Sequence, residues 1–269
     1  MPFDKENPIG IFDSGIGGLT VARAIQEHLP NERLIYFGDT AHLPYGEKST
    51  AAIQAYSVKI CQFLLDKGCK VIVIACHSAS AAAFELIQEY VGKKAIALNV
   101  IDPTVEYISN LSISTVGLIG TRQTVGSKVY ERKFSEHMPE KSLKALPTPL
   151  LVPMVEEGFY KNDISKRIIS EYLNAHELGG IEALVLGCTH FPLIKKEIDE
   201  FYEGKVMSID PSEVVAKTLK NTLEKRELSS EKRSGEHHFY VSDFTESFQH
   251  STQTFFGNEV KLEEVPLWE

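Results

Sequence analysis

The chain has 269 residues, of which 43% are hydrophobic and 24% are charged, so it can form one large globular domain or two of ordinary size. Its formal net charge of −9, without any basic cluster, argues against a nucleic-acid-binding surface. No apolar run approaches the roughly 20 residues of a membrane span. The four cysteines have neither disulfide nor C-x-x-C spacing, which predicts free thiols in a cytoplasmic protein.

The first part of the chain alternates short apolar runs with amphipathic stretches. A strand at 8–12 leads into the turn DSGIGGLT and a helix, whose exposed first amides favour an anion. A second strand at 33–37 ends in the surface loop GDTAHLPYGEKS, and an amphipathic helix covers 50–68. Asp13 and Ser14 lie at a strand end. A helix cap alone would explain Asp13, but capping does not require three glycines.

The stretch VIVIACHSASAA at 71–82 has the most informative pattern in the chain. Its opening apolar run is typical of a strand buried on both faces, and a helical pattern follows after Cys76, His77 and Ser78. We therefore place Cys76 where a central strand ends and a helix begins. Ligands bind at that edge of open α/β sheets, and a helix N-terminus favours a thiolate over a thiol.

The rest of the chain continues the alternation. Further strands are predicted at 95–101, 115–119, 205–209, 238–242 and near 259–265. Helices are predicted through Val125, Val129 and Phe134, from about Asp163, and through Phe244, Phe248 and Phe255. Asp102-Pro103 and Asp210-Pro211 each resemble an N-cap followed by the first helical residue. Residues 139–153 are expected to form a strand with irregular flanks, and the charged residues 224–238 a solvated loop.

The stretch ALVLGCTHFPLI at 183–194 repeats the pattern around Cys76: an apolar run, then Cys188, Thr189 and His190, then a helical pattern. Other landmarks recur in nearly the same register. Asp13 corresponds to Thr121 and Asp102 to Asp210, both at an offset of 108 residues, while the two cysteines are 112 apart. Three matches indicate two related halves.

We therefore predict an α/β protein of two pseudo-symmetric, three-layer domains with mostly parallel sheets. The first domain would comprise residues 1–98 and 211–269, and the second residues 99–210. Facing halves would place Cys76 and Cys188 on opposite walls of one cleft.

Two facing thiols suit several kinds of chemistry. A zinc site with His190 lacks tightly spaced ligand pairs, a redox pair would be expected in C-x-x-C, and a Cys188–His190 hydrolase leaves Cys76 without a role. Burial of two cysteines after core strands does not explain the matched polar residues that follow both. Proton exchange by a base on each face of a carbon centre uses both thiols. Hydroxyls and helix N-termini would stabilise the carbanion, and four hydroxyls are suitably placed: Ser14, Ser78, Thr121 and Thr189.

The motifs DSGIGGLTV, GDTAHLPYG, ACHSASA, VEEG and GCTHFPL, in this order and spacing, resemble the glutamate racemase family from about Ile9 to Pro211. The resemblance implies a cofactor-independent, metal-free isomerase, usually a homodimer, that interconverts L- and D-glutamate and supplies D-glutamate for peptidoglycan. It implies neither a nucleic-acid partner nor a membrane. Aspartate racemase is the alternative within the superfamily, and a thiol-dependent hydrolase or amidase is the alternative from another class.

The resemblance also assigns roles to individual residues. Cys76 and Cys188 match the two bases of the family, and three further residues match groups that assist them: Asp13, His190 and Glu156. The residues matching substrate contacts are Ser14, Pro44, Tyr45, Gly46, His77, Ser78, Thr121 and Thr189. This chain departs from the family where Asn-Thr normally follows the first cysteine, because His77-Ser78 stands there. The hydroxyl is kept, but an imidazole replaces an amide.

Overall fold

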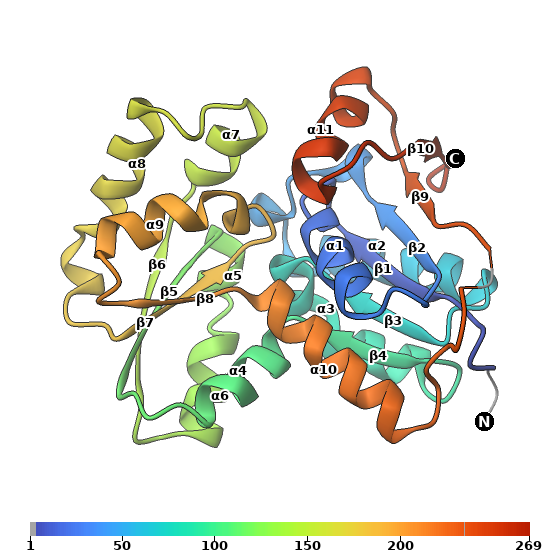
Figure 1. The fold of residues 1–269 in the computed structure, drawn as a ribbon, viewed down its shortest axis with the longest axis horizontal. Helices are drawn as coiled ribbons and strands as arrows, with labels where there is room; N and C mark the ends of the chain where they lie inside the picture. Colours follow the sequence, from blue (N-terminus) through green and yellow to red (C-terminus); the bar gives the residue numbers. More distant parts are fainter. Residues whose placement is uncertain (1–3, 234) are drawn as a thin grey trace.

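The computed structural model describes residues 4–233 and 235–269, which form two parallel β-sheets set side by side with helices packed on both (Figure 1). The six-stranded sheet has the order β10-β9-β2-β1-β3-β4, and the four-stranded sheet has the order β6-β5-β7-β8. All strand pairs within the described ranges are parallel. The predicted α/β class with two sets of parallel strands is confirmed.

The strands of the first sheet are β1 (Ile9–Asp13), β2 (Leu34–Gly38), β3 (Val71–Ile74), β4 (Ile96–Asn99), β9 (His238–Val241) and β10 (Leu262–Glu264). Those of the second sheet are β5 (Thr115–Gly120), β6 (Ser142–Pro147), β7 (Ala183–Gly187) and β8 (Met207–Ile209). We call the first sheet with its flanking segments, residues 4–99 and 238–269, the first lobe, and residues 115–209 the second lobe. The predicted division into domains includes residues 1–3 and 234, which lie outside the described residues.

The α-helices of the first lobe are α1 (Leu19–His28), α2 (Thr50–Asp66), α3 (His77–Val91) and α11 (Glu246–Phe256). Those of the second lobe are α5 (Arg122–Gly126), α6 (Val129–His137), α7 (Leu151–Glu156), α8 (Asp163–Leu173) and α9 (Lys195–Tyr202). Two helices connect the lobes: α4 (Ile101–Ser109) and α10 (Pro211–Lys225). Within the described part of the chain, none of these helices has the length and apolar character needed to cross a membrane.

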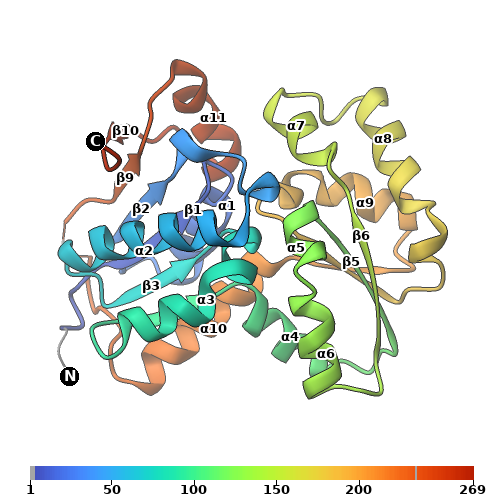
Figure 2. The same cartoon turned by 180° about the vertical axis from the view of Figure 1, so that it is seen from behind.

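Alternation of apolar side chains along the central strands gives the first sheet its two helix-covered faces. Ile9 and Ile11 pack in the same cluster as the buried residues of α1 and α10, whereas Ile72 and Ile74 pack with those of α2 and α3. Figure 1 looks onto the α1 side, and Figure 2 shows α2 and α3 on the opposite side. The strands are therefore buried on both faces, as their continuous apolar sequences require.

The two lobes share one strand order. The series β2-β1-β3-β4 in the first sheet corresponds to β6-β5-β7-β8 in the second, in the same chain order and all parallel. Cys76 follows β3, and Cys188 follows the corresponding strand β7. The repeated spacing in the sequence thus has a counterpart in the topology.

The chain passes between the lobes twice. Helix α4 leads from β4 to β5, and α10 leads from β8 back toward β9, packing on both α1 and α4 (Figures 1 and 2). Asp210 caps α10, because its Oδ1 accepts the N–H of Ser212 at 2.9 Å. The matching prediction for Asp102 is wrong, since α4 begins at Ile101, one residue before Asp102, and Asn99 Oδ1 accepts the N–H groups of residues 101 and 102.

Two further expectations need correction. The helix expected through Val125, Val129 and Phe134 is divided into α5 and α6 at Lys128, whose φ of 56° lies in the left-handed region. The charged segment expected to be a solvated loop is not wholly solvated, because Leu228 and Ser230 within it are buried. Charge density in the sequence did not reveal that this segment docks onto a buried ion pair.

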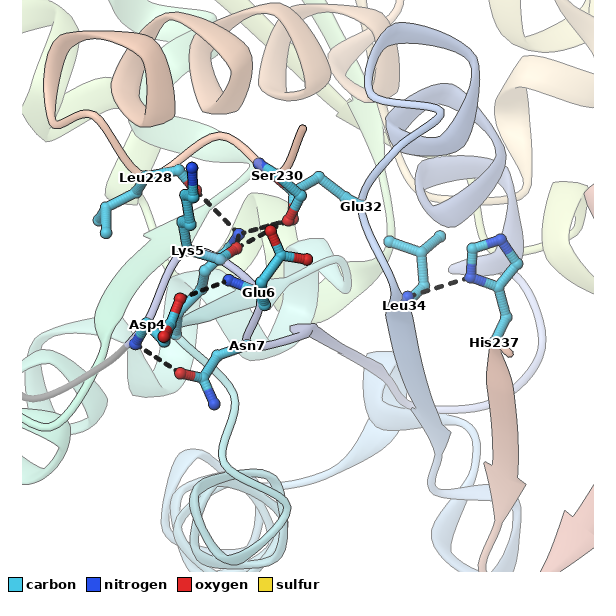
Figure 3. Close-up of polar contacts among 10 residues, drawn as sticks. Asp4, Lys5, Glu6, Asn7, Glu32, Leu34, Leu228, Ser230 and His237 are labelled. Atoms are coloured by element: carbon cyan, nitrogen blue, oxygen red, sulfur yellow. Dashed lines mark hydrogen bonds and ion pairs between the residues drawn. The ribbon is translucent and has the colours of Figure 1, made fainter. Parts of the chain in front are cut away.

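That ion pair joins Lys70 to Glu32 at 2.7 Å, with both side chains almost completely excluded from solvent. Lys70 Nζ also donates to the carbonyl of Leu228 at 2.9 Å, and Glu32 Oε1 accepts the N–H of Ser230 at 2.8 Å. Figure 3 shows the surrounding contacts, which include the N-terminal residues Asp4 to Asn7. Because Ser230 Oγ also donates to the carbonyl of Lys5 at 2.7 Å, the network fastens residues 4–7 and the segment after α10 to the base of the first sheet.

Candidate active site

A single pocket between the lobes is lined by both Cys76 and Cys188. Its first-lobe wall comes from the loops after β1 and β2 and the start of α3. Its second-lobe wall comes from the segments after β5, β6 and β7. All of these segments follow the carboxyl ends of parallel strands, which is where α/β proteins bind ligands.

The pocket brings together every predicted site residue except Asp13. The predicted residues that line it are Ser14, Pro44, Tyr45, Gly46, Cys76, His77, Ser78, Glu156, Cys188, Thr189, Thr121 and His190. Asp13 lies behind the wall, completely buried. Its Oδ2 accepts the N–H groups of Gly15 and Gly18 at 3.1 and 3.0 Å and so shapes the glycine-rich turn.

Cys76 is the N-cap of α3, and its sulfur is nearly buried. The thiol donates toward Ser14 Oγ at 3.6 Å, while the sulfur accepts the N–H of Ala79 at 3.4 Å. Burial, and secondarily the negative charge of Asp13, raises the pKa of Cys76 to about 12. This group is therefore held as a thiol, despite its position at a helix N-terminus.

Cys188 has different neighbours. Its sulfur lies 3.7 Å from His190 Nδ1, and His190 Nε2 lies 3.0 Å from Glu156 Oε1. Burial lowers the pKa of His190, but hydrogen bonds with Cys188 and Glu156 and their negative charges outweigh burial and raise this pKa to about 10. The imidazole is thus held in its charged form, between a carboxylate and a sulfur.

Hydroxyl groups connect the two lobes across the pocket floor. Ser78 Oγ at the start of α3 lies 2.9 Å from Thr121 Oγ1, and Thr121 Oγ1 lies 3.0 Å from Thr124 Oγ1. Thr121 caps α5 by accepting the N–H of Thr124 at 3.1 Å. Two helix N-termini, from α3 and α5, therefore meet at a hydroxyl cluster, an arrangement that suits a carboxylate ligand.

The loop after β2 closes one side of the pocket. Tyr45 is buried, and its hydroxyl donates to Asp39 Oδ2 at 2.5 Å. A Cβ on Gly46 would lie 2.9 Å from Thr121 Cβ, so this loop touches the second lobe directly. Exposed Glu47 and Arg122 form a long ion pair of 3.7 Å across the same gap.

His77 is buried, and neither ring nitrogen has a hydrogen-bond partner among the described residues. Burial lowers its pKa to about 3, so the imidazole is neutral. One N–H donor and one acceptor are thus available at the pocket wall.

Several lining residues were missed from the sequence. Thr148 directly follows β6 and is buried, and its neighbours Pro149 and Val152 also line the pocket. A polar residue just after a strand was the available signal, but four prolines obscured where that strand ended. Arg122, next to Thr121, was likewise overlooked. Across the described ranges, no group of three or more His, Cys, Asp or Glu side chains is placed to hold a metal ion.

Comparison with known proteins agrees with this geometry. The model of the Asp/Glu/Hydantoin racemase family matches residues 19–219, about three quarters of the chain. The chain belongs to this family. A glutamate racemase of Neisseria meningitidis serogroup A is 38% identical to the chain over 263 residues, which is 97% of each protein.

Solved structures of family members agree as well. The glutamate racemase of Francisella tularensis, crystallised with D-glutamate, is 39% identical and superposes with a TM-score of 0.91 over 98% of this chain and 99% of its own. An aspartate racemase of Picrophilus torridus covers 83% of this chain and 99% of its own with a TM-score of 0.61, but at 19% identity it shows only a shared fold.

Proposed function

We propose that this protein is a glutamate racemase that inverts Cα by two-base proton exchange, with Cys76 and Cys188 as the bases. The observation that carries the proposal is the pairing of these thiols. They follow corresponding strands, β3 and β7, and line one pocket from opposite lobes. A hydrolase would leave Cys76 without a role, and burial of two cysteines alone does not explain the matched polar residues that follow both.

The reaction exchanges one proton for another at the same carbon. The thiolate on one side takes the proton from Cα and becomes a thiol, leaving a planar carbanion whose charge spreads into the carboxylate. The thiol on the other side then gives its proton to the opposite face and becomes a thiolate. The product is the enantiomer, and the two sulfurs have exchanged their protonation states. Positioned acid–base groups of this kind each contribute about 10²–10⁴-fold.

The neighbours of the sulfurs would tune these transfers. His190, held charged by Glu156, can donate to the sulfur of Cys188 when that sulfur carries negative charge. Asp13 acts on Cys76 through its charge. The hydroxyls of Ser78 and Thr121, with the helix N-termini behind them, would hold the α-carboxylate and stabilise the charge that develops on it.

Glutamate is favoured over aspartate as substrate. The relatives of 35–39% identity are glutamate racemases, and one was crystallised with D-glutamate. The aspartate racemase is much more distant. A thiol-dependent hydrolase or amidase is disfavoured, because Cys188 with His190 would suffice for it and Cys76 would have no role.

The wider role follows from this assignment. We propose that the enzyme works in the cytoplasm as a homodimer without a cofactor and supplies D-glutamate for peptidoglycan. We further propose that residues 1–98 with 211–269 and residues 99–210 are its two domains, so that the cleft can open as the lobes move on α4 and α10.

The deciding experiment is turnover of L-glutamate in heavy water. A two-base racemase incorporates deuterium at Cα and brings optical rotation to zero, whereas a hydrolase does neither.

Cys76→Ala and Cys188→Ala should each abolish racemisation. Cys61→Ala, which changes a buried thiol in α2 away from the pocket, is the matched control and should remain active. Racemisation by either pocket variant at the rate of the unmodified protein contradicts the two-base mechanism.

A further inference from the structure

The C-terminal segment returns to the loop that closes the pocket. Val265 N–H donates to the carbonyl of Val241 at 2.9 Å, which fixes the segment beside the first sheet. Trp268, the single tryptophan of the chain, then donates its indole N–H to Asp39 Oδ1 at 2.8 Å. A residue at the far end of the sequence thus contacts the start of the substrate loop.

Asp39 is the centre of this contact. It directly follows β2, and its side chain is completely buried. Its Oδ2 accepts the hydroxyl of Tyr45 at 2.5 Å, and its Oδ1 accepts the hydroxyl of Ser242 at 2.8 Å in addition to the indole N–H. A buried carboxylate requires such donors, and hydrogen bonds to a charged acceptor are the strong ones.

Aromatic rings cover this carboxylate from outside. His42, which lies 3.0 Å from Asp39 Oδ2, stacks on Tyr56 at a centroid distance of 4.0 Å. Trp268 makes T-shaped contacts with both rings, at centroid distances of 4.5 Å from His42 and 5.3 Å from Tyr56. The indole therefore supplies a hydrogen bond and also part of the cover over the buried charge.

The loop held in this way reaches the active site. Tyr45, Gly46 and Glu47 line the pocket, and Gly46 packs against Thr121 of the second lobe. The contacts from Trp268 through Asp39 to Tyr45 thus end at the pocket wall. The sulfurs of Cys76 and Cys188 lie on other elements, after β3 and β7.

We propose that Trp268 is a positioning residue for substrate binding, which holds the Tyr45 loop against the pocket by way of Asp39. This inference rests on the proposed function. Loss of the indole N–H leaves the buried carboxylate with one donor fewer and a gap in its cover. Water can then compete for Asp39, and Tyr45 is held less firmly. Substrate binding weakens, while proton transfer between Cα and the sulfurs is left intact.

The first test is the kinetics of Trp268→Phe, which keeps a ring but removes the N–H. We expect KM for glutamate to rise about three- to tenfold, the factor that one net hydrogen bond implies, with kcat changed by less than about twofold. Glu269→Gln, a change at the exposed neighbouring residue, is the control and should leave both constants unaltered. In the double variant with Tyr45→Phe, the Trp268 change should add little, because both act through Asp39.

The second measurement uses the fluorescence of this single tryptophan in the unmodified protein. Glutamate should change the emission in a saturable way with a midpoint near KM, and Tyr45→Phe should suppress the change. A folded Trp268→Phe variant with an unaltered KM overturns the inference. If that variant does not fold, an emission insensitive to glutamate overturns it. Both of these results contradict only the role of Trp268, provided that the protein still racemises glutamate. Absence of racemisation in the unmodified protein would instead contradict the proposed function.

Discussion

Two buried histidines in the pocket have pKa values shifted in opposite directions, and their partners explain why. His190 contacts the Cys188 sulfur through one ring nitrogen and the Glu156 carboxylate through the other, and these hydrogen bonds and their electrostatic attraction raise its pKa to about 10. His77 is equally buried but has no hydrogen-bond partner among the described residues, so its pKa falls to about 3. Burial alone favours the neutral imidazole, and only added negative charge reverses that preference.

The charge of His190 gives the first prediction. Its folded pKa of about 10 exceeds the usual 6.5, so its contribution to stability is complete below pH 6.5 and is lost as pH rises through 10. Glu156→Gln removes one source of that shift. We therefore expect the alkaline limb of the kcat/KM profile, and the NMR titration of the His190 ring, to move to lower pH. Glu157→Gln, at the adjacent exposed carboxylate, is the control; an identical profile in Glu156→Gln would contradict the assignment.

The neutrality of His77 gives the second prediction. Because its folded pKa is about 3, unfolding takes up a proton below pH 6.5, and stability is lost as pH falls from 6.5 toward 3. Between pH 6.5 and 4.5, the free energy of unfolding should fall by about 2–3 kcal/mol less in His77→Asn than in the unmodified protein. Urea unfolding at both pH values measures this, with His176→Asn at an exposed histidine as control. Turnover should be kept or improved, and complete loss would give His77 a catalytic role.

At the scale of elements, the glycine-rich turn between β1 and α1 is packed against the other lobe. A Cβ on Gly17 would lie 2.4 Å from His190 Cε1 and 2.6 Å from Thr189 Oγ1. The glycine-rich turn that the sequence suggested for anion binding therefore also packs against the Cys188 segment. A side chain there has no room without displacing a residue of the pocket.

Gly17→Ala should accordingly lower kcat/KM by about 10²-fold or more, because misplacement of a catalytic group by 1 Å has effects of that size. Overpacking should also reduce the free energy of unfolding by about 1–3 kcal/mol. Gly126→Ala is the matched control, since a Cβ at that exposed glycine meets nothing within 4 Å. Steady-state kinetics and urea unfolding test both variants, and normal activity in Gly17→Ala would show that the contact is unimportant.

Sequence patterns located the strand ends well and the loops poorly. The apolar runs before Cys76 and Cys188 are continuous, so a buried strand and its carboxyl end could be predicted from local sequence. Asp39 and Thr148 directly follow β2 and β6, but the partners that hold Asp39, Ser242 and Trp268, come from the far end of the chain, and no local pattern encodes such contacts. The cap of α4 was misassigned because Asn99 and Asp102 are both good capping residues, and tertiary placement decided between them.

At the scale of the whole molecule, the buried pair Lys70–Glu32 joins segments that are far apart in sequence. No sequence periodicity indicates that a lysine before a strand is buried. Removing one member of such a pair leaves an uncompensated charge in the interior, which typically costs about 3–5 kcal/mol.

Lys70→Met should therefore destabilise the protein by about that amount in urea unfolding, with KM for glutamate unaltered in the folded protein. The double variant Glu32→Leu with Lys70→Met should recover at least half of the loss, because it leaves no charge behind. Lys59→Met, at a lysine that packs over the ring of Trp268, is the comparison for loss of a surface charge. Equal stabilities of the single and double variants would show that charge burial is not the cause.

The unlike neighbours of the two sulfurs have a thermodynamic consequence. Mirror-image substrates have equal free energies in an achiral solvent, so the equilibrium constant between them is one. The Haldane relation then forces kcat/KM to be the same in both directions, however different the surroundings of Cys76 and Cys188. The asymmetry between a thiol beside Ser14 and a sulfur beside His190 can therefore make the turnover numbers of the two enantiomers differ only by the same ratio as their Michaelis constants.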